Sequence, residues 1–230
     1  MNKLESGINS YLEGDANTAE RLLKSYLEDT KNPESQAYYY VGLIYDDAGK
    51  TTDAGVYFQK ALEIDPNKSI YHYRLGMVYA QLMLFQQAIL HLEKTLEKNP
   101  EHVRAHLILG SIYLKNGELP KAVIQFRNVV KISPDYAMGY YDLGNALYYS
   151  GDVAEAKVTF EKALSISNDI QEVHHKMALI LADEKNYTAA LAHMEQAITL
   201  GFSESATIHQ LADILLSAGM SKEAERLKSY

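Results

Sequence analysis

A repeat of 34 residues runs through most of this 230-residue chain and restricts its fold more than any other feature. Pro66, Pro100 and Pro134 are spaced at this interval. Six alanines keep the same spacing: Ala54, Ala88, Ala122, Ala156, Ala190 and Ala224. A third column holds small residues: Gly42, Gly76, Gly110, Gly144, Ala178 and Ala212. Several columns with one interval indicate successive copies of one structural unit, which begin at Ser35, Ser69, Val103, Ala137, Gln171 and Ser205.

Each copy contains two apolar stretches with the period of a helix, separated by a short turn. In the copy that begins at Ser69, the first stretch covers Tyr71–Tyr79 and the second runs from about Phe85 to Leu96. Glycines lie between paired stretches, where the end of a helix favours a left-handed residue: Gly49, Gly117, Gly151 and Gly219. The column of Gly and Ala predicts that the paired helices approach closely. The chain is therefore expected to be all-α and built of antiparallel helix pairs.

This pattern resembles the tetratricopeptide repeat (TPR). Counted from the start of each copy, the family has an aromatic residue at position four, Leu-Gly at seven and eight, and Tyr at eleven. Ala follows at twenty, Phe at twenty-four, Ala at twenty-seven and Pro at thirty-two. The copy from Ser35 matches these positions in residue type: Tyr38, Val41, Gly42, Tyr45, Ala54, Phe58, Ala61 and Pro66. Departures occur at position twenty-seven, with Thr95 and Val129, and at position thirty-two, with Asn168 and Phe202.

The resemblance implies an all-α fold, a right-handed α-solenoid superhelix of antiparallel helix pairs. Residues 1–34 are expected to form a degenerate first repeat, because Ala19, Leu23 and Tyr26 match the second-helix positions after a shift of one residue. Five full repeats follow at 35–68, 69–102, 103–136, 137–170 and 171–204, and a truncated repeat covers 205–230. We expect about seven repeats in one solenoid that spans residues 1–230.

The composition excludes several classes of function. Lys and Arg number 22 against 30 Asp and Glu, a net charge of −8, which argues against nucleic acid as a partner. The chain has no cysteine, so it has no disulfide, thiolate zinc site or cysteine nucleophile. No apolar run approaches the ~20 residues of a membrane span. Met1–Asn9 has no apolar signal core, so a cytoplasmic location is expected, with a leader removed beforehand as the open alternative.

Catalytic and metal-binding patterns are weak. No Gly-rich phosphate loop, nucleophile elbow or HExxH pattern occurs in the sequence. His175, His209 and Asp213 could supply metal ligands from adjacent first helices, but a polar end of the binding surface is the preferred interpretation. We therefore expect no enzyme activity, no catalytic residues, no metal and no cofactor.

In the TPR family the first helix of each pair lines a concave groove, to which positions two, five, nine, twelve and thirteen contribute. The expected partner-binding residues follow from this resemblance: Tyr39, Leu43, Ile70, Tyr73, Met77, Arg104, Leu107, Ser111, Met138, Tyr141, Asn145, Tyr148, His175 and His209. Tyr is suited to such a surface because it offers a large contact area with few rotatable bonds. Another set of tyrosines is expected to pack the helix stack: Tyr38, Tyr45, Tyr79, Tyr113 and Tyr140.

Chaperone-binding members of the family use a carboxylate clamp, which needs Lys or Arg at position five and Asn at position nine. Here position five carries no Lys or Arg, and Asn145 is the only Asn at position nine. The sequence therefore favours an apolar peptide or helix of another protein in the groove. Two alternatives stay open: the groove is filled by a terminal helix or by another copy, or it has no specific use. A self-assembling structural scaffold, and hence a homo-oligomer, is the competing functional hypothesis.

The last copy is expected to lack a cover. Its second helix, about Ser221 to Ser229, ends next to the last residue, Tyr230. Four apolar side chains are expected to be left uncovered at this end: Leu211, Ile214, Leu215 and Leu227. A solenoid end without a polar cap is poorly soluble, so fraying or end-to-end association is expected.

Overall fold

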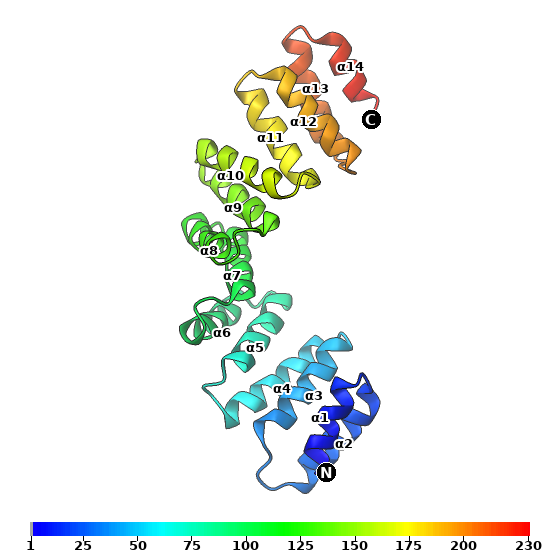
Figure 1. Ribbon diagram of the computed structural model, residues 1–230, viewed down its shortest axis with the longest axis vertical. Coiled ribbons are helices and arrows are strands. Elements are labelled where there is room, and N and C mark those ends of the chain that lie inside the picture. The colour runs from blue at the N-terminus through cyan, green and yellow to red at the C-terminus, as the bar shows by residue number, and fades with distance from the viewer. Residues whose placement is uncertain (1) are drawn as a thin grey trace. The chain divides into compact units, whose positions relative to one another are not determined.

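The computed structural model describes residues 2–230 and consists of fourteen α-helices over that range (Figure 1). No strand occurs among the described residues. The fold is that of a TPR-like α-solenoid, as predicted, with two helices in each of about seven repeats. Within the described residues, no helix is long and apolar enough to cross a membrane.

The helices alternate between the first and second members of each pair. The first members are α1 (Lys3–Leu12), α3 (Ser35–Asp47), α5 (Ser69–Gln81), α7 (Val103–Lys115), α9 (Ala137–Ser150), α11 (Gln171–Asp183) and α13 (Ser205–Ser217). The second members are α2 (Ala16–Asp29), α4 (Thr51–Ile64), α6 (Phe85–Lys98), α8 (Leu119–Ile132), α10 (Val153–Ile166), α12 (Tyr187–Thr199) and α14 (Ser221–Lys228).

The chain forms two compact units, Met1–Ile112 and Tyr113–Tyr230. In the first unit the helices pair as α1 with α2, α3 with α4 and α5 with α6, while α2 packs on α3 and α4 packs on α5. The second unit repeats this scheme with α9 and α10, α11 and α12, and α13 and α14. The single solenoid over residues 1–230 stays a prediction.

A small residue at position eight lets the two helices of a pair approach closely. A Cβ atom added to Gly42 would lie 2.6 Å from Cε1 of Phe58, and one added to Gly144 would lie 2.5 Å from Cε1 of Phe160. Both distances are too short for real atoms, so a larger side chain would push the helices apart. The same contact joins Gly7 to Leu23 in the first repeat. This confirms the close approach that the sequence predicts.

The turn within each pair needs a left-handed residue. Glycine supplies it at Gly49, Gly117, Gly151 and Gly219, whose φ angles lie between 72° and 88°. Two pairs have other residues at this point: Met83 has φ 58° and Lys185 has φ 62°. Side chains other than glycine adopt this conformation at a cost, so these two turns are strained.

The last repeat corrects one expectation. Leu211, Leu215 and Leu227 are fully buried rather than uncovered, and Ile214 is half-buried. The burial arises because α14 packs on α13, while α13 also contacts α11 and α12. Leu216 remains 49% exposed on this repeat.

Candidate functional site

The first-helix face is the surface formed by positions two, five, nine and twelve of the first helices, and it is described separately in each unit. In the first unit, position two exposes Ile70, with 36% of its surface accessible, and also Arg104. Ser111 is exposed, whereas Met77 and Leu107 are half-buried. These residues offer an apolar surface with a polar margin.

Position five of the first unit is more buried than the sequence suggests. Tyr39 is half-buried, because its ring lies 5.0 Å from the ring of Tyr71 and 5.9 Å from that of Phe58. Burial raises the pKa of the Tyr39 hydroxyl. Tyr73 is only 5% exposed, and its ring lies 4.3 Å from that of His102 in the linker between α6 and α7.

The expectation of exposure is therefore wrong for three residues of the predicted surface: Leu43, Tyr73 and His175. Leu43 belongs to the core that surrounds Phe58. His175 stacks on Phe202, with 4.4 Å between ring centroids, just as Tyr73 packs on His102. In both cases a linker residue covers the aromatic ring at position five.

Four other residues of the predicted surface in the second unit remain accessible. Met138 is 38% exposed and His209 is exposed, while Tyr141 and Tyr148 are half-buried. Burial, with a contribution from the carboxylates of Glu172 and Asp142, raises the pKa of Tyr141 to about 12.

A lysine packs against two of the tyrosines in the second unit. Nζ of Lys176 lies 5.1 Å from the ring centroid of Tyr148 and 5.0 Å from that of Tyr149, and it donates a 3.4 Å hydrogen bond to the Tyr149 hydroxyl. The two rings meet edge to face at 5.8 Å. This arrangement is a cation–π contact that leaves the lysine directed at the aromatic rings.

The first helices of both units contain buried polar atoms without a hydrogen-bond partner. In the described part of the chain, no hydrogen bond reaches the Tyr73 hydroxyl or Arg74 Nε in the first unit, or Asn145 Oδ1 and His175 Nε2 in the second. Such atoms are costly in a folded protein, so each needs an explanation. Arg74 otherwise faces Asp46, with 3.6 Å between Nη1 and Oδ2.

The structure does not bring the three candidate metal ligands together. His175 stacks on Phe202, and Asp213 forms a 2.6 Å ion pair with Lys228. Over residues 2–230, no group of three or more His, Asp or Glu side chains could hold a metal ion.

Four of the five tyrosines expected to pack the stack do so, while Tyr140 is half-buried. Tyr38, Tyr45 and Tyr79 are partly buried against the core, and Tyr113 is 5% exposed. The ring of Tyr38 also lies 6.5 Å from that of Tyr57 on the second helix.

Two histidine pairs, which the sequence analysis did not predict, join the first and second helices of their repeats. Nδ1 of His72 lies 2.9 Å from Nδ1 of His91, and the same distance separates Nδ1 of His174 from Nδ1 of His193. These rings occupy positions four and twenty-three of their repeats. The sequence contains a signal for these pairs, because the two histidines of each pair are separated by the same 19 residues.

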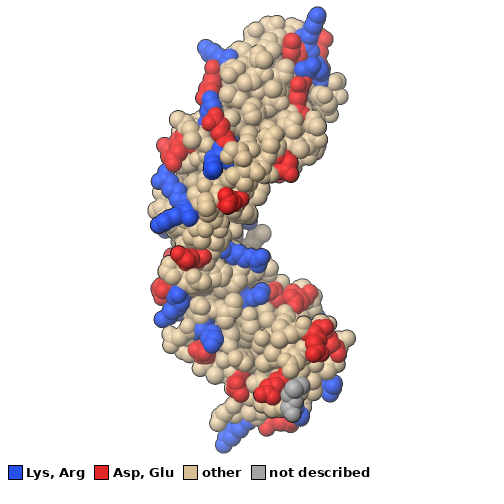
Figure 2. All heavy atoms as spheres, viewed as in Figure 1, with Lys and Arg blue, Asp and Glu red and all other residues tan. Residues whose placement is uncertain are grey.

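The charged side chains are scattered in both signs over the face seen in Figure 2, without a continuous basic patch. This distribution agrees with the net charge of −8 and gives no support to a phosphate-binding surface.

Comparison with known proteins identifies the repeat. Models of the tetratricopeptide repeat match residues 35–68, 73–137, 137–170 and 171–200. No sequence in the set of curated proteins matches the chain.

Solved structures show the same fold. PilF of Pseudomonas aeruginosa has a TM-score of 0.70 and 23% identity, over 84% of this chain and 88% of PilF. A tetratricopeptide repeat protein from Parabacteroides merdae gives 0.70 and 18%, over 99% and 91% of the two chains. YrrB, described as a TPR protein with an unusual peptide-binding site, gives 0.71 and 19%, over 82% and 96%. At these identities the likeness concerns the fold. Together with the repeat matches, it assigns this chain to the tetratricopeptide repeat family.

Proposed function

We propose that this protein is a non-enzymatic scaffold that holds a peptide or an amphipathic helix of another protein against its first-helix faces. TPR folds serve in general as protein–protein interaction scaffolds. The observation that carries the proposal is the exposure of Ile70 and Met138 at position two of the two units. Apolar side chains exposed beside aromatic residues are typical of interaction sites.

Two further points support a protein partner. The peptide-binding site described for YrrB belongs to a protein of the same fold. The described residues also lack a group of acids and histidines that could hold a metal ion, which leaves binding as the simpler use of this surface.

An affinity-capture experiment tests the proposal. The full chain is immobilised, and the proteins it retains from a lysate of its source are measured by quantitative mass spectrometry. A variant with Ile70→Asp and Met138→Asp is compared with a control that has Leu90→Asp and Ile124→Asp. The control residues are 51% and 57% exposed but lie on the second helices α6 and α8. We expect a partner that the wild type and the control retain and the first variant loses. Equal retention by all three contradicts the proposal.

Self-assembly is the second candidate function. It is favoured by apolar side chains exposed on the last repeat, Leu216 at 49% and Tyr230 at 63%. Light scattering over a concentration series separates the two functions. A scaffold for another protein keeps a constant monomer mass, whereas a self-assembling array gains mass with concentration.

A further inference from the structure

We propose that the second unit binds a basic segment of its partner, with a lysine or arginine side chain in the pocket lined by Tyr136, Met138, Asp169, Ile170 and Glu172. This inference rests on the proposed function, because it specifies the chemistry of the partner that the first-helix face holds. The face is thereby assigned to a cationic rather than a purely apolar ligand.

The pocket has walls that match a long basic side chain. It has a volume of about 420 Å³ and lies where the linker after α10 leads into α11, opposite the start of α9. Tyr136 and Met138 form an apolar wall and are 40% and 38% exposed. Lysine and arginine bury their hydrocarbon stems along such walls while the charged end reaches a carboxylate.

The two carboxylates of the pocket have no basic partner. Asp169 accepts a hydrogen bond from the Ser167 hydroxyl, and Glu172 accepts one of 3.2 Å from the amide of Gln171. No Lys or Arg lines the pocket. Among the described residues, neither acid forms an ion pair.

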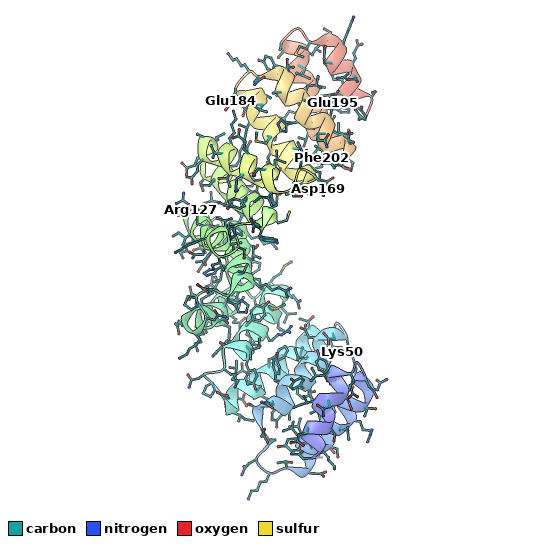
Figure 3. All side chains as sticks on the ribbon, viewed as in Figure 1. Lys50, Arg127, Asp169, Glu184, Glu195 and Phe202 are labelled. Carbon is teal, nitrogen blue, oxygen red and sulfur yellow. The ribbon has the colours of Figure 1, made fainter. Side chains whose placement is uncertain are left out.

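Three acids on other parts of the same unit form ion pairs. Glu155 pairs with Arg127 at 2.7 Å, Glu184 pairs with Lys157 at 2.6 Å, and Glu195 pairs with Arg226. In Figure 3, Arg127, Glu184 and Glu195 lie away from Asp169, which is found where the α10–α11 linker ends. The pocket therefore keeps negative charge that no basic side chain of the described residues pairs with, and a partner's cation would neutralise it.

Helix α9 carries two further side chains that can accept hydrogen bonds. Asp142 lies one helical turn after Met138, and among the described residues its carboxylate forms no ion pair. Burial raises its pKa to about 6. One turn further, Asn145 Oδ1 is a buried acceptor without a donor.

Lys176 of α11 does not pair with these acids. Nζ of Lys176 instead lies over the rings of Tyr148 and Tyr149. His175 Nε2, on a side chain 9% exposed, is a further buried group without a partner on this face. Within the pocket, a basic side chain of the bound segment would supply donors to the carboxylates of Asp169 and Glu172.

The experiment uses the full chain, labelled with ¹⁵N, and three small probes: the N-acetyl N-methylamides of lysine, arginine and norleucine. Norleucine keeps the hydrocarbon stem and lacks the charge. We expect saturable chemical-shift changes at Met138, Ile170 and Glu172 with lysine or arginine, and much weaker changes with norleucine. The lysine and arginine arms show which cation the pocket prefers.

Two matched variants complete the test. Glu172→Gln removes a charge from the pocket, and we expect it to lower the affinity for the cationic probes about fivefold. Glu161→Gln removes the same charge from the exposed surface of α10 and should leave the affinity unchanged. The inference is overturned if norleucine binds as well as lysine, if no changes occur at the pocket, or if both variants behave alike.

Failure of this inference is distinguishable from failure of the proposed function. A captured partner that is lost by the Ile70→Asp and Met138→Asp variant, yet binds Glu172→Gln as tightly as the wild type, leaves the scaffold function intact. It rejects only the basic segment.

Discussion

Nδ1 of His72 lies 2.9 Å from Nδ1 of His91, so one ring must donate and the other accept. Nε2 of His72 lies 2.9 Å from the carbonyl oxygen of Pro66, which only accepts. Nε2 of neutral His72 therefore carries the proton, and its Nδ1 accepts from His91. His174 repeats the arrangement with His193 and with the carbonyl of Asn168 at 3.1 Å. Each pair links both helices of a repeat to the linker before it.

This geometry predicts that acid destabilises both units. Burial, with a contribution from the charge of His72, lowers the pKa of His91 to about 4, and burial also lowers the pKa of His193. In the unfolded chain these groups titrate near ~6.5, so the unfolded state binds protons first as the pH falls. Stability should be constant above about pH 7 and decrease from about pH 6.5 toward pH 4. Thermal melts across this range measure the effect.

Another repeat of the chain suggests the control variant for the effect of pH. The repeat from Val103 carries Gln125 at the position of His91 and His193. The double variant His91→Gln and His193→Gln cannot take up protons at these positions, and it should lose less Tm between pH 7 and pH 5 than the wild type. An unchanged pH profile would assign the acid sensitivity to other groups.

The strained turn at Met83 predicts a stabilising substitution. Met83 has φ 58°, a conformation that costs a side chain about 1–2 kcal/mol. Met83 is 72% exposed, so its removal loses little packing. Met83→Gly should stabilise the protein by up to about 1 kcal/mol, after the larger backbone entropy of glycine is subtracted. Denaturation by urea measures the difference.

Gly117 is the matched control for this turn. It has φ 73°, and no other atom lies within 4 Å of the place where its Cβ would be. Gly117→Ala should therefore destabilise the protein by about 1 kcal/mol through backbone strain alone. A destabilising Met83→Gly would mean that the methionine side chain makes a contact that its exposure hides.

A larger side chain at position twenty should destabilise the protein. Ala122 is completely buried on α8. Ala122→Leu should overpack this contact and destabilise the protein by about 1–3 kcal/mol. The midpoint of chemical denaturation measures the change. A variant as stable as the parent would contradict the assignment of alanines at this position to the closest helix contact.

The sequence predicts the helices well, because their signals are local and repeated. The stretches Tyr71–Tyr79 and Phe85–Leu96 lie within α5, Ser69–Gln81, and α6, Phe85–Lys98. The first repeat was harder to place. Gly7 packs on Leu23 at the same separation of 16 residues as Gly42 and Phe58, but its position is shifted by one residue against the other copies. The extra residue hides Gly7 from a strict 34-residue comparison.

The exposure of the first-helix face is less predictable from the sequence, because it depends on the linkers. Phe202 replaces the proline of position thirty-two and His102 lies at position thirty-four, and these two linker residues cover His175 and Tyr73. A column of aromatic residues at position five therefore includes both accessible and buried rings. The partial exposure of Tyr141 could be predicted from its position in the repeat. The burial of Tyr73 could not, because it depends on the conformation of the linker that carries His102.

The burial of Tyr73 changes what its substitution should do. Its ring is 5% exposed and packs on His102, so Tyr73→Ala should destabilise the protein by about 3–5 kcal/mol. Tyr141→Ala, which removes a half-buried ring, should cost less. Thermal melts of the two single variants test the difference, and equal losses would mean that position five is packed alike in both units.

Removal of the Tyr73 hydroxyl alone gives a sharper test. The hydroxyl is buried and, among the described residues, has no hydrogen-bond partner, which costs about 1–3 kcal/mol in the folded state. Tyr73→Phe keeps the ring contact with His102 and removes this cost, so the free protein should become as stable as the wild type or more stable. Tyr45→Phe is the matched control, because the Tyr45 hydroxyl accepts a 2.7 Å hydrogen bond from Lys24 and donates one of 3.0 Å to Glu20. Its loss should destabilise the protein by about 1 kcal/mol. If Tyr73→Phe is destabilised as much as Tyr45→Phe, the Tyr73 hydroxyl has a hydrogen-bond partner in solution.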